Sequence, residues 1–266
     1  MSEGVQHRRF ADKVALVTGA GSGMGAAIAR QLAVEGARRV VAADLNGEAV
    51  KALAAGLSVV RAVVLDVADP AAVDDAVADV VREHGRLDVV VHAAGVDDPQ
   101  AKQLIADALD EGCPPEVTDR LGDDSWRRVM RVNLDGTFHV LRAAVRAMRP
   151  AGAGAIVVIG SSSAFDTPVG YPHYSASKAG VHALSQAVAK EVIASGIRVN
   201  VVAPGPTETG MAARTPKVLR NGFADPRVRP YATPEEVGDI ALFLASDAAM
   251  NLVGAVLLAN GGRFTA

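Results

Sequence analysis

Tyr174 and Lys178 are the residues of this sequence whose types and spacing point most directly to chemistry. They lie four positions apart in Tyr-Ser-Ala-Ser-Lys, so in a helix both side chains share one face. A free tyrosine has a pKa of about 10, which is too high for a base at neutral pH, but a neighbouring ammonium group favours the phenolate. The pair could therefore move a proton to or from a substrate oxygen, although a solvent-exposed helix pair has the same spacing.

Other polar residues could complete such a site. Ser161, Ser162 and Ser163 follow an apolar run at 156–160, where a hydroxyl group could hold a substrate carbonyl. Asn133 interrupts an amphipathic helical pattern, and its amide could take a buried backbone or water hydrogen bond. Taken singly, the serines also fit a polar loop and the asparagine fits a locally bonded core amide.

A glycine-rich segment indicates that a dinucleotide binds. Residues 18–25 read Thr-Gly-Ala-Gly-Ser-Gly-Met-Gly, between an apolar run at 14–18 and a helical pattern over 23–35. Glycines permit a tight turn and let the backbone approach a pyrophosphate at the positive end of a helix. A strand before the glycines and a helix after them is the context that the dinucleotide fingerprint requires. We predict that the cofactor contacts Gly19, Gly21, Ser22, Gly23, Met24 and Gly25.

Asp44 indicates which dinucleotide binds. It ends the second apolar run, about twenty residues beyond the glycines, where an acid can hold the adenosine ribose hydroxyls. Its carboxylate would repel a 2′-phosphate, and neither Ser22 nor Leu45 supplies a compensating cation, although Arg38 and Arg39 lie earlier in the segment. The sequence favours NAD over NADP, with Leu45 as a further contact. The alternative is that Asp44 only caps the following helix.

The elements that must position these residues follow from a regular alternation of apolar runs and helical patterns. Short, continuously apolar, β-branched strands between helices are typical of a parallel sheet covered on both faces, and right-handed crossovers make it doubly wound. We predict one α/β domain over 12–266, a seven-stranded Rossmann sheet with helices on both faces, behind a flexible leader at 1–11. The strands are expected at 14–18, 40–44, 59–66, 87–93, 156–160, 199–203 and 256–259, and helices at 23–35, 48–55, 124–148, 174–195 and 234–246, with a further helix opening at Asp69-Pro70.

Residues 96–125 break the alternation. This stretch carries three prolines and two acidic clusters directly after the fourth predicted strand. A loop of this length in a compact domain is usually functional or mobile, and ligands bind at the carboxyl edge of such a sheet. We interpret 96–125 as an inserted segment near the active site that could cover the substrate pocket or extend a subunit contact.

The composition argues against several function classes. The formal net charge is −3 and the basic residues are scattered, so no nucleic-acid partner is expected. Cys113 is the only cysteine, which excludes an intrachain disulfide and a thiolate metal site and suits a cytoplasmic location. No metal is predicted. The first apolar run, at 14–17, is too short to span a membrane.

Taken together, these motifs resemble the short-chain dehydrogenase/reductase family over nearly the whole chain. Ser161 stands thirteen residues before Tyr174, the family's usual separation, so it is preferred to Ser162 and Ser163. The closest likeness is to 3-oxoacyl-carrier-protein reductases, which usually prefer NADPH, and Asp44 departs from that preference. The other matching pieces are Asp66-Val67, Asn133, and the segments 204–209, 243–247 and 260–262.

The resemblance implies hydride transfer between a nicotinamide cofactor and an alcohol or ketone carbon. In this family pattern Tyr174 is the acid/base, Ser161 orients the substrate oxygen, and Lys178 binds the nicotinamide ribose and lowers the pKa of Tyr174. Asn133 holds a water that links Lys178 to solvent. A homotetramer, or a dimer, is implied as well. The further cofactor contacts it implies are Asp66, Val67, Ala93, Gly95, Tyr174, Lys178, Pro204, Gly205, Thr207 and Thr209.

Two alternatives and one gap remain. An NADPH-linked reductase of 3-oxoacyl thioesters would share these motifs. A non-catalytic nucleotide sensor would lack at least one of the four catalytic residues, whereas all of them are present here: Asn133, Ser161, Tyr174 and Lys178. His92 replaces the family's usual asparagine and is expected to be a hydrogen-bonded core histidine. The substrate is a small alcohol or ketone of unknown identity, because no charged clamp is recognisable: Arg214, Lys217 and Arg220 fit a solvated helix equally well.

Overall fold

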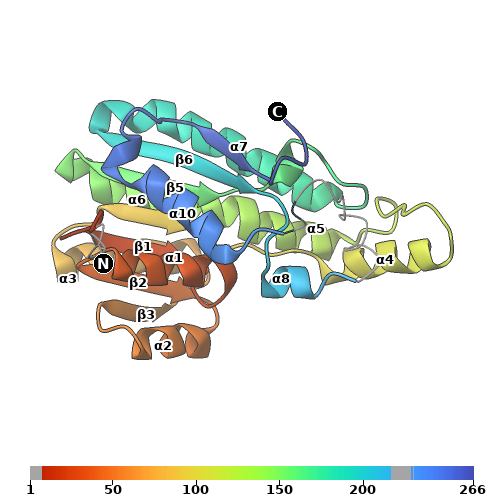
Figure 1. The fold of residues 1–266 in the computed structure, drawn as a ribbon, viewed down its shortest axis with the longest axis horizontal. Coiled ribbons are helices and arrows are strands. Elements are labelled where there is room, and N and C mark those ends of the chain that lie inside the picture. The colour runs from red at the N-terminus through yellow and green to blue at the C-terminus, as the bar shows by residue number, and fades with distance from the viewer. Residues whose placement is uncertain (1–7, 217–228, 230) are drawn as a thin grey trace, which may run out of the picture.

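The centre of the molecule is a seven-stranded parallel sheet in the order β3-β2-β1-β4-β5-β6-β7 (Figure 1). The computed structural model describes residues 8–216, 229 and 231–266. The chain adds β2 and β3 on one side of β1 and then returns to add β4 to β7 on the other, which confirms the doubly wound sheet. The strands are β1 (Val14–Thr18), β2 (Arg39–Asp44), β3 (Val60–Val64), β4 (Val89–His92), β5 (Gly154–Ile159), β6 (Ile197–Pro204) and β7 (Val256–Ala259).

Helices cover both faces of the sheet because alternate residues of each buried strand face opposite sides. In β1, Ala15 and Val17 pack with α1, α2 and α10, whereas Val14 and Leu16 pack with α3, α6 and α7. The helices are α1 (Gly23–Val34), α2 (Gly47–Ala55), α3 (Pro70–His84), α4 (Pro99–Asp110), α5 (Asp123–Met130), α6 (Gly136–Met148), α7 (Pro172–Val192), α8 (Gly210–Ala213) and α10 (Pro234–Ala245).

The long helix predicted over 124–148 is not continuous. It is divided into α5 and α6 by a π-helical turn, Arg131–Asp135, which carries Asn133. A π-turn inserts one residue into the helical hydrogen-bond pattern, and such turns occur mostly at functional sites. The amphipathic pattern of the sequence did not reveal this interruption, because residues on both sides of it keep a helical spacing.

The segment 96–125 contains a helix, which the sequence analysis did not predict because it treated the segment as a long loop. It contains α4, where Asp98 caps the first turn by accepting the Gln100 N–H at 3.1 Å and Pro99 occupies the first helical position. This is the same Asp-Pro signal that opens α3. Ala101 and Ile105 of α4 pack with Val117 in a small satellite core. Figure 1 shows α4 in yellow beyond the carboxyl ends of the strands.

The folded domain begins before residue 12, where the sequence analysis had placed the end of a flexible leader at 1–11. Phe10 is buried in the core cluster of α1 and α10, and Ala11 forms a β-bridge with Ala37. Arg9 makes an ion pair with Glu35, so this stretch belongs to the folded domain. Residues 1–7 lie outside the described part of the chain. Over the part that is described, every helix falls short of the length and apolarity needed to cross a bilayer.

Candidate active site

Ser161, Tyr174 and Lys178 meet at the carboxyl edge of the sheet. Ser161 lies two residues beyond the end of β5, and its Oγ accepts the Ser163 N–H at 3.1 Å. Tyr174 lies in the first turn of α7, and its hydroxyl is hydrogen-bonded to the Ser161 side chain. Lys178 lies one turn further along α7, and its Nζ is 6.0 Å from the centroid of the Tyr174 ring. Tyr174 and Lys178 therefore lie on one face of α7, as their four-residue spacing predicted.

The electrostatics of these groups differ from our expectation. Burial raises the pKa of Tyr174, the hydrogen bond with Ser161 lowers it, and the negative charge of Asp97 raises it. Burial lowers the pKa of Lys178 to about 8, and its Nζ donates to the Ile159 carbonyl at 3.0 Å. Burial is therefore the main cause that holds the pKa of Tyr174 above its ordinary value, and the hydrogen bond from Ser161 opposes it.

Asn133 joins the inserted segment to the catalytic helix. Its Oδ1 accepts the Val96 N–H at 2.8 Å, and its Nδ2 donates to the Val96 carbonyl at 3.0 Å and to Ser177 Oγ at 3.1 Å. The amide is 1% exposed. This is the locally bonded core amide considered from the sequence, and it fixes the point where the chain leaves β4.

The glycine segment forms a tight turn at the end of β1. Gly19 has a φ of +69°, and a Cβ there would lie 2.6 Å from the Ala94 nitrogen, while a Cβ on Gly25 would lie 2.2 Å from the Gly19 carbonyl oxygen. Ser22 precedes α1 with no side-chain cap hydrogen bond among the described residues, and the first turn of α1 holds no acidic residue. Uncapped N–H groups at a helix N-terminus are the donors that a pyrophosphate needs, so this turn fits a dinucleotide.

Asp44 lies against the glycine segment. Its Oδ2 accepts the Gly21 N–H at 2.9 Å, and its Oδ1 accepts the Asn46 N–H at 2.8 Å. Asn46, not Asp44, caps α2 by accepting the Ala49 N–H at 3.2 Å, so the capping alternative is wrong. Leu45 is 69% exposed beside it. A carboxylate therefore stands at the outer end of the glycine turn.

The other predicted cofactor contacts lie along the carboxyl edge of β1, β3 and β4. Asp66 Oδ1 accepts the Ala68 N–H at 2.9 Å, and Val67 packs against Gly136 at the start of α6. The Ala93 N–H donates to the Thr18 carbonyl at 3.2 Å, next to the switch point between β1 and β4. A Cβ on Gly95 would lie 3.5 Å from Lys178 Nζ, so the lysine reaches this edge as well.

Ser161 and Tyr174 line a pocket of about 420 Å³ that could hold a substrate. A larger hollow of about 660 Å³ between α1 and α10 contains neither Ser161 nor Tyr174, so the chemistry belongs to the smaller one. Predicted residues that line the smaller pocket are Met24, Ser161, Tyr174, Pro204, Gly205, Thr207 and Thr209.

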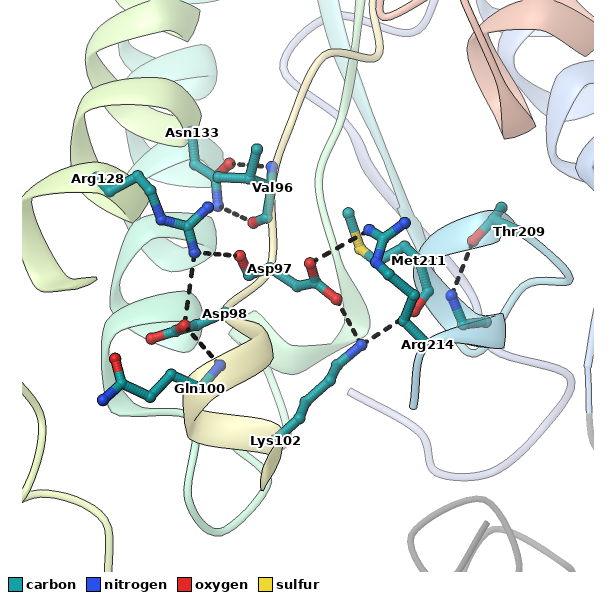
Figure 2. Close-up of polar contacts among 11 residues, drawn as sticks. Val96, Asp97, Asp98, Gln100, Lys102, Arg128, Asn133, Thr209, Met211 and Arg214 are labelled. Atoms are coloured by element: carbon teal, nitrogen blue, oxygen red, sulfur yellow. Dashed lines mark hydrogen bonds and ion pairs between the residues drawn. The ribbon is translucent and has the colours of Figure 1, made fainter. Parts of the chain in front are cut away.

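The sequence analysis missed Asp97 and Lys102, which line the same pocket. They form a buried ion pair, and Arg214 Nη2 lies 3.5 Å from Asp97 Oδ1 (Figure 2). Lys217 and Arg220, the other cations considered as a clamp, lie outside the described residues. The Asp98-Pro99 helix signal would have placed Asp97 at the sheet edge, but no sequence pattern indicated its pairing with Lys102.

Further contacts bind the inserted segment to the catalytic helices. Arg128 of α5 donates to the Asp97 carbonyl at 2.8 Å, and Asp98 Oδ2 lies 3.1 Å from Nε2 of His173, the residue before Tyr174. His173 and Asp98 are both almost fully buried. Together with the amide of Asn133, these contacts attach the segment at three points (Figure 2 shows two of them, through Arg128 and Asn133).

Two buried histidines flank Lys178. His92 Nδ1 lies 2.7 Å from Thr18 Oγ1, and burial lowers the pKa of His92 to about 3, so it is a neutral core residue. Its Nε2 is buried without a hydrogen-bond partner among the described residues, so the expected hydrogen-bonding is only partial. His182, which the sequence analysis missed, accepts the Ser161 N–H at 3.3 Å and thereby supports the turn after β5.

Comparison with known proteins identifies the family of this chain. The family described as Enoyl-(Acyl carrier protein) reductase matches residues 19–263. Cis-4-hydroxycyclohexanecarboxylate dehydrogenase of Sinomonas cyclohexanicum is 39% identical over 95% of this chain and 97% of its own, and D-threitol dehydrogenase of Mycolicibacterium smegmatis is 39% identical over 96% and 94%. The crystal structure of gox2181 superposes with a TM-score of 0.83 at 31% identity, covering 97% of both chains. The chain belongs to the short-chain dehydrogenase/reductase family, whose members are oxidoreductases that use NAD or NADP.

Lys178→Met is expected to stabilise the protein at pH 7 by about 1–3 kcal/mol, because a buried ammonium is removed at the cost of one hydrogen bond. Below about pH 8 the lysine is charged in both the folded and unfolded states, so the full cost of burying the charge is present. As the pH rises from about 8 towards 10.5, the folded state loses the proton first and the advantage of the variant declines.

Equilibrium urea unfolding at pH 7 and at pH 10.5 measures this difference. Lys190→Met, which removes an exposed ammonium from the same helix, is the control and should change the stability by less than about 0.5 kcal/mol. A Lys178→Met protein that is less stable than the wild type at pH 7 would contradict the prediction.

Proposed function

We propose that this protein is an NAD(H)-dependent oxidoreductase that interconverts a secondary alcohol and a ketone, with Tyr174 as the acid/base. The observation that carries this proposal is the hydrogen bond between Tyr174 and Ser161 inside the pocket, with the ammonium of Lys178 beside the tyrosine ring. A hydroxyl pair next to a cation suits proton exchange with a substrate oxygen.

In the oxidative direction, the Tyr174 phenolate takes the proton of the substrate hydroxyl while the carbon–hydrogen bond breaks and the carbonyl forms. Ser161 donates to the same oxygen and orients it. A bound oxidised nicotinamide would supply the hydride acceptor, and its positive charge would favour the phenolate. Lys178 binds the nicotinamide ribose in this proposal, and the hydrogen bond from Ser161 opposes the effects of burial and of Asp97 on the pKa of Tyr174. Asn133 holds the adjacent backbone and the water that serves Lys178.

Cofactor choice rests on Asp44. In this proposal the glycine turn would hold the pyrophosphate at the N-terminus of α1. The Asp44 carboxylate beside Gly21 would accept hydrogen bonds from the ribose hydroxyls and would repel a 2′-phosphate. Relatives named 3-oxoacyl-[acyl-carrier-protein] reductase, from Salmonella typhimurium (32% identical) and Thermotoga maritima (36% identical), favour the second candidate, an NADPH-linked reductase of 3-oxoacyl thioesters. The carboxylate of Asp44 argues against it. A nucleotide sensor without activity is disfavoured because Ser161, Tyr174 and Lys178 converge.

The proposal extends to location and assembly. The single cysteine suits a reducing cytoplasm, and the family resemblance suggests a homotetramer, or a dimer. The alanines Ala143, Ala144 and Ala189 pack inside the subunit and do not bear on this assembly. The dehydrogenases of cis-4-hydroxycyclohexanecarboxylate and D-threitol support a small alcohol as the substrate.

A screen of secondary alcohols with NAD and with NADP tests the proposed function. We expect at least one alcohol to reduce NAD, followed by the absorbance of the reduced cofactor, with a higher kcat/KM than with NADP. A 3-oxoacyl thioester tested with NADPH provides the comparison. Faster turnover of that thioester would favour the second candidate, and no turnover with any alcohol under either cofactor would contradict the proposal.

A further inference from the structure

The wall of the active-site pocket contains a buried ion pair contributed by the inserted segment. The side chains of Asp97 and Lys102 are 9% and 8% exposed. Lys102 Nζ donates to Asp97 Oδ2 and, at 3.0 Å, to the Met211 carbonyl, so it spans from α4 to α8 (Figure 2). Both residues line the pocket that contains Ser161 and Tyr174.

The pair has hydrogen-bonding capacity left on its pocket side. An ammonium group has three donors, and the described contacts of Lys102 use two of them. Oδ1 of Asp97 lies 3.5 Å from Arg214, whose side chain is 57% exposed, so this oxygen has no short hydrogen bond among the described contacts. One donor and one acceptor therefore adjoin each other where the substrate binds.

Charged side chains in a substrate pocket make the free energy of binding depend on which groups of the substrate replace their water. A buried ion pair already loses hydration, and an apolar substrate would remove the remaining water without replacing its hydrogen bonds. A hydroxyl group both donates and accepts, so it can satisfy the carboxylate and the ammonium at once. The pair therefore discriminates in favour of a substrate with a hydroxyl group at this wall.

The charge balance of the pocket distinguishes a hydroxyl from a carboxylate. Among the described lining residues the two acids, Asp97 and Asp166, balance the two bases, Lys102 and Arg263. Arg214 pairs with Asp97 from outside this lining, with its side chain 57% exposed. A substrate carboxylate at the pair would have to compete with Asp97 for Lys102 and would meet a like charge at close range. Asp97, Lys102 and Tyr174 line the same pocket, so the pair shares the space in which the proposed reaction takes place.

We propose that the substrate is a neutral diol or polyol whose second hydroxyl donates to Asp97 and accepts from Lys102. This inference rests on the proposed function, because it assumes that the first hydroxyl is oxidised at Tyr174. The pair is a specificity determinant: it recognises the substrate away from the reacting carbon.

Matched cyclic alcohols test the inference, because the ring stays constant while its second substituent changes. The series is cyclohexanol, the cyclohexanediols and 4-hydroxycyclohexanecarboxylate, with butan-2-ol, butane-2,3-diol and threitol as an open-chain series. We expect kcat/KM for the best diol or polyol to exceed that for the matched mono-alcohol by ~10–100-fold, as for a lost hydrogen bond to a charged group. A carboxylate preferred over the diol, or equal rates for mono-alcohol and diol, would overturn the inference.

Variants locate the preference. Asp97→Asn with Lys102→Gln removes both charges together, so neither is left buried and unpaired, and the diol-to-mono-alcohol ratio should fall to about one. Asp107→Asn, on the exposed face of the same helix, is the matched control and should keep the wild-type ratio. A double variant that retains the ratio would overturn the assignment to this pair.

Binding separates this inference from the proposed function. The rise in Tm that each compound causes in the presence of NADH is measured for the wild type and the double variant. We expect a diol or polyol to raise Tm only in the wild type. If no alcohol is turned over, the proposed function fails, while the Tm shift still decides whether Asp97 and Lys102 bind a hydroxylated ligand. No shift with any diol or polyol would overturn the inference.

Discussion

Tyr174→Phe is expected to lower kcat/KM for alcohol oxidation by ~10²–10⁴-fold, the usual contribution of general acid–base catalysis. The substitution keeps the ring in the first turn of α7 and removes only the hydroxyl that is bonded to Ser161. Because a proton acceptor is lost, kcat should fall together with kcat/KM, whereas binding of NADH should change little. Steady-state kinetics with the best alcohol from the screen, and a fluorescence titration with NADH, measure the two effects.

Tyr171→Phe is the matched control for this experiment. Tyr171 lines the same pocket three residues earlier, but it lacks the Ser161 hydrogen bond that lowers the pKa of Tyr174, and burial raises its own pKa to about 12. Its loss should cost less than ~10-fold in kcat/KM. If Tyr174→Phe oxidised the alcohol as fast as the wild type, or if the two variants lost equal activity, Tyr174 would not be the acid/base.

Asp44→Asn combined with Leu45→Arg is expected to shift the cofactor preference toward NADP. The change removes the carboxylate beside the glycine turn and adds a cation at a position that is 69% exposed. Since juxtaposed like charges cost several kcal/mol, the ratio of kcat/KM for NADP to that for NAD should rise by ~10²–10³-fold. Asparagine has one oxygen acceptor, so it can keep the hydrogen bond from the Gly21 N–H or from the Asn46 N–H, but not both.

Asp69→Asn is the control variant, because it removes a carboxylate at the same edge of the sheet but away from the glycine turn. Asp69 caps α3, and asparagine caps equally well, so neither the stability nor the cofactor ratio should change much. A wild-type enzyme that already uses NADP as well as NAD would contradict the role given to Asp44. So would an unchanged ratio in the double variant.

The parts of the fold that were predictable are those set by local patterns. β1 was located to the residue because Val14 to Thr18 are all buried, and a strand buried on both faces appears in the sequence as one apolar run. The Tyr174–Lys178 pair was predictable for a similar reason, since four residues on a helix fix a shared face. Gly19 needs a positive φ, and the sequence pattern already indicated a turn there.

The parts that could not be predicted depend on contacts between distant residues. Lys102 reaches the Met211 carbonyl across 109 positions of the chain, and no local pattern encodes that meeting. The π-turn at Asn133 depends on how its amide pairs with Val96, which is a tertiary contact. The helix α4 is a different case, because the Asp98-Pro99 signal was present in the sequence and the length of the segment obscured it.

The three attachment points of the inserted segment bear on how the protein can acquire new substrates. Asn133, Arg128 and His173 hold the segment from outside the pocket, through the backbone of Val96 and Asp97 and the side chain of Asp98. The inward side chains of α4 are not part of this attachment. Substitutions of these side chains are expected to change the substrate preference while the proton-transfer groups keep their positions. The segment can therefore diverge in sequence without disturbing catalysis.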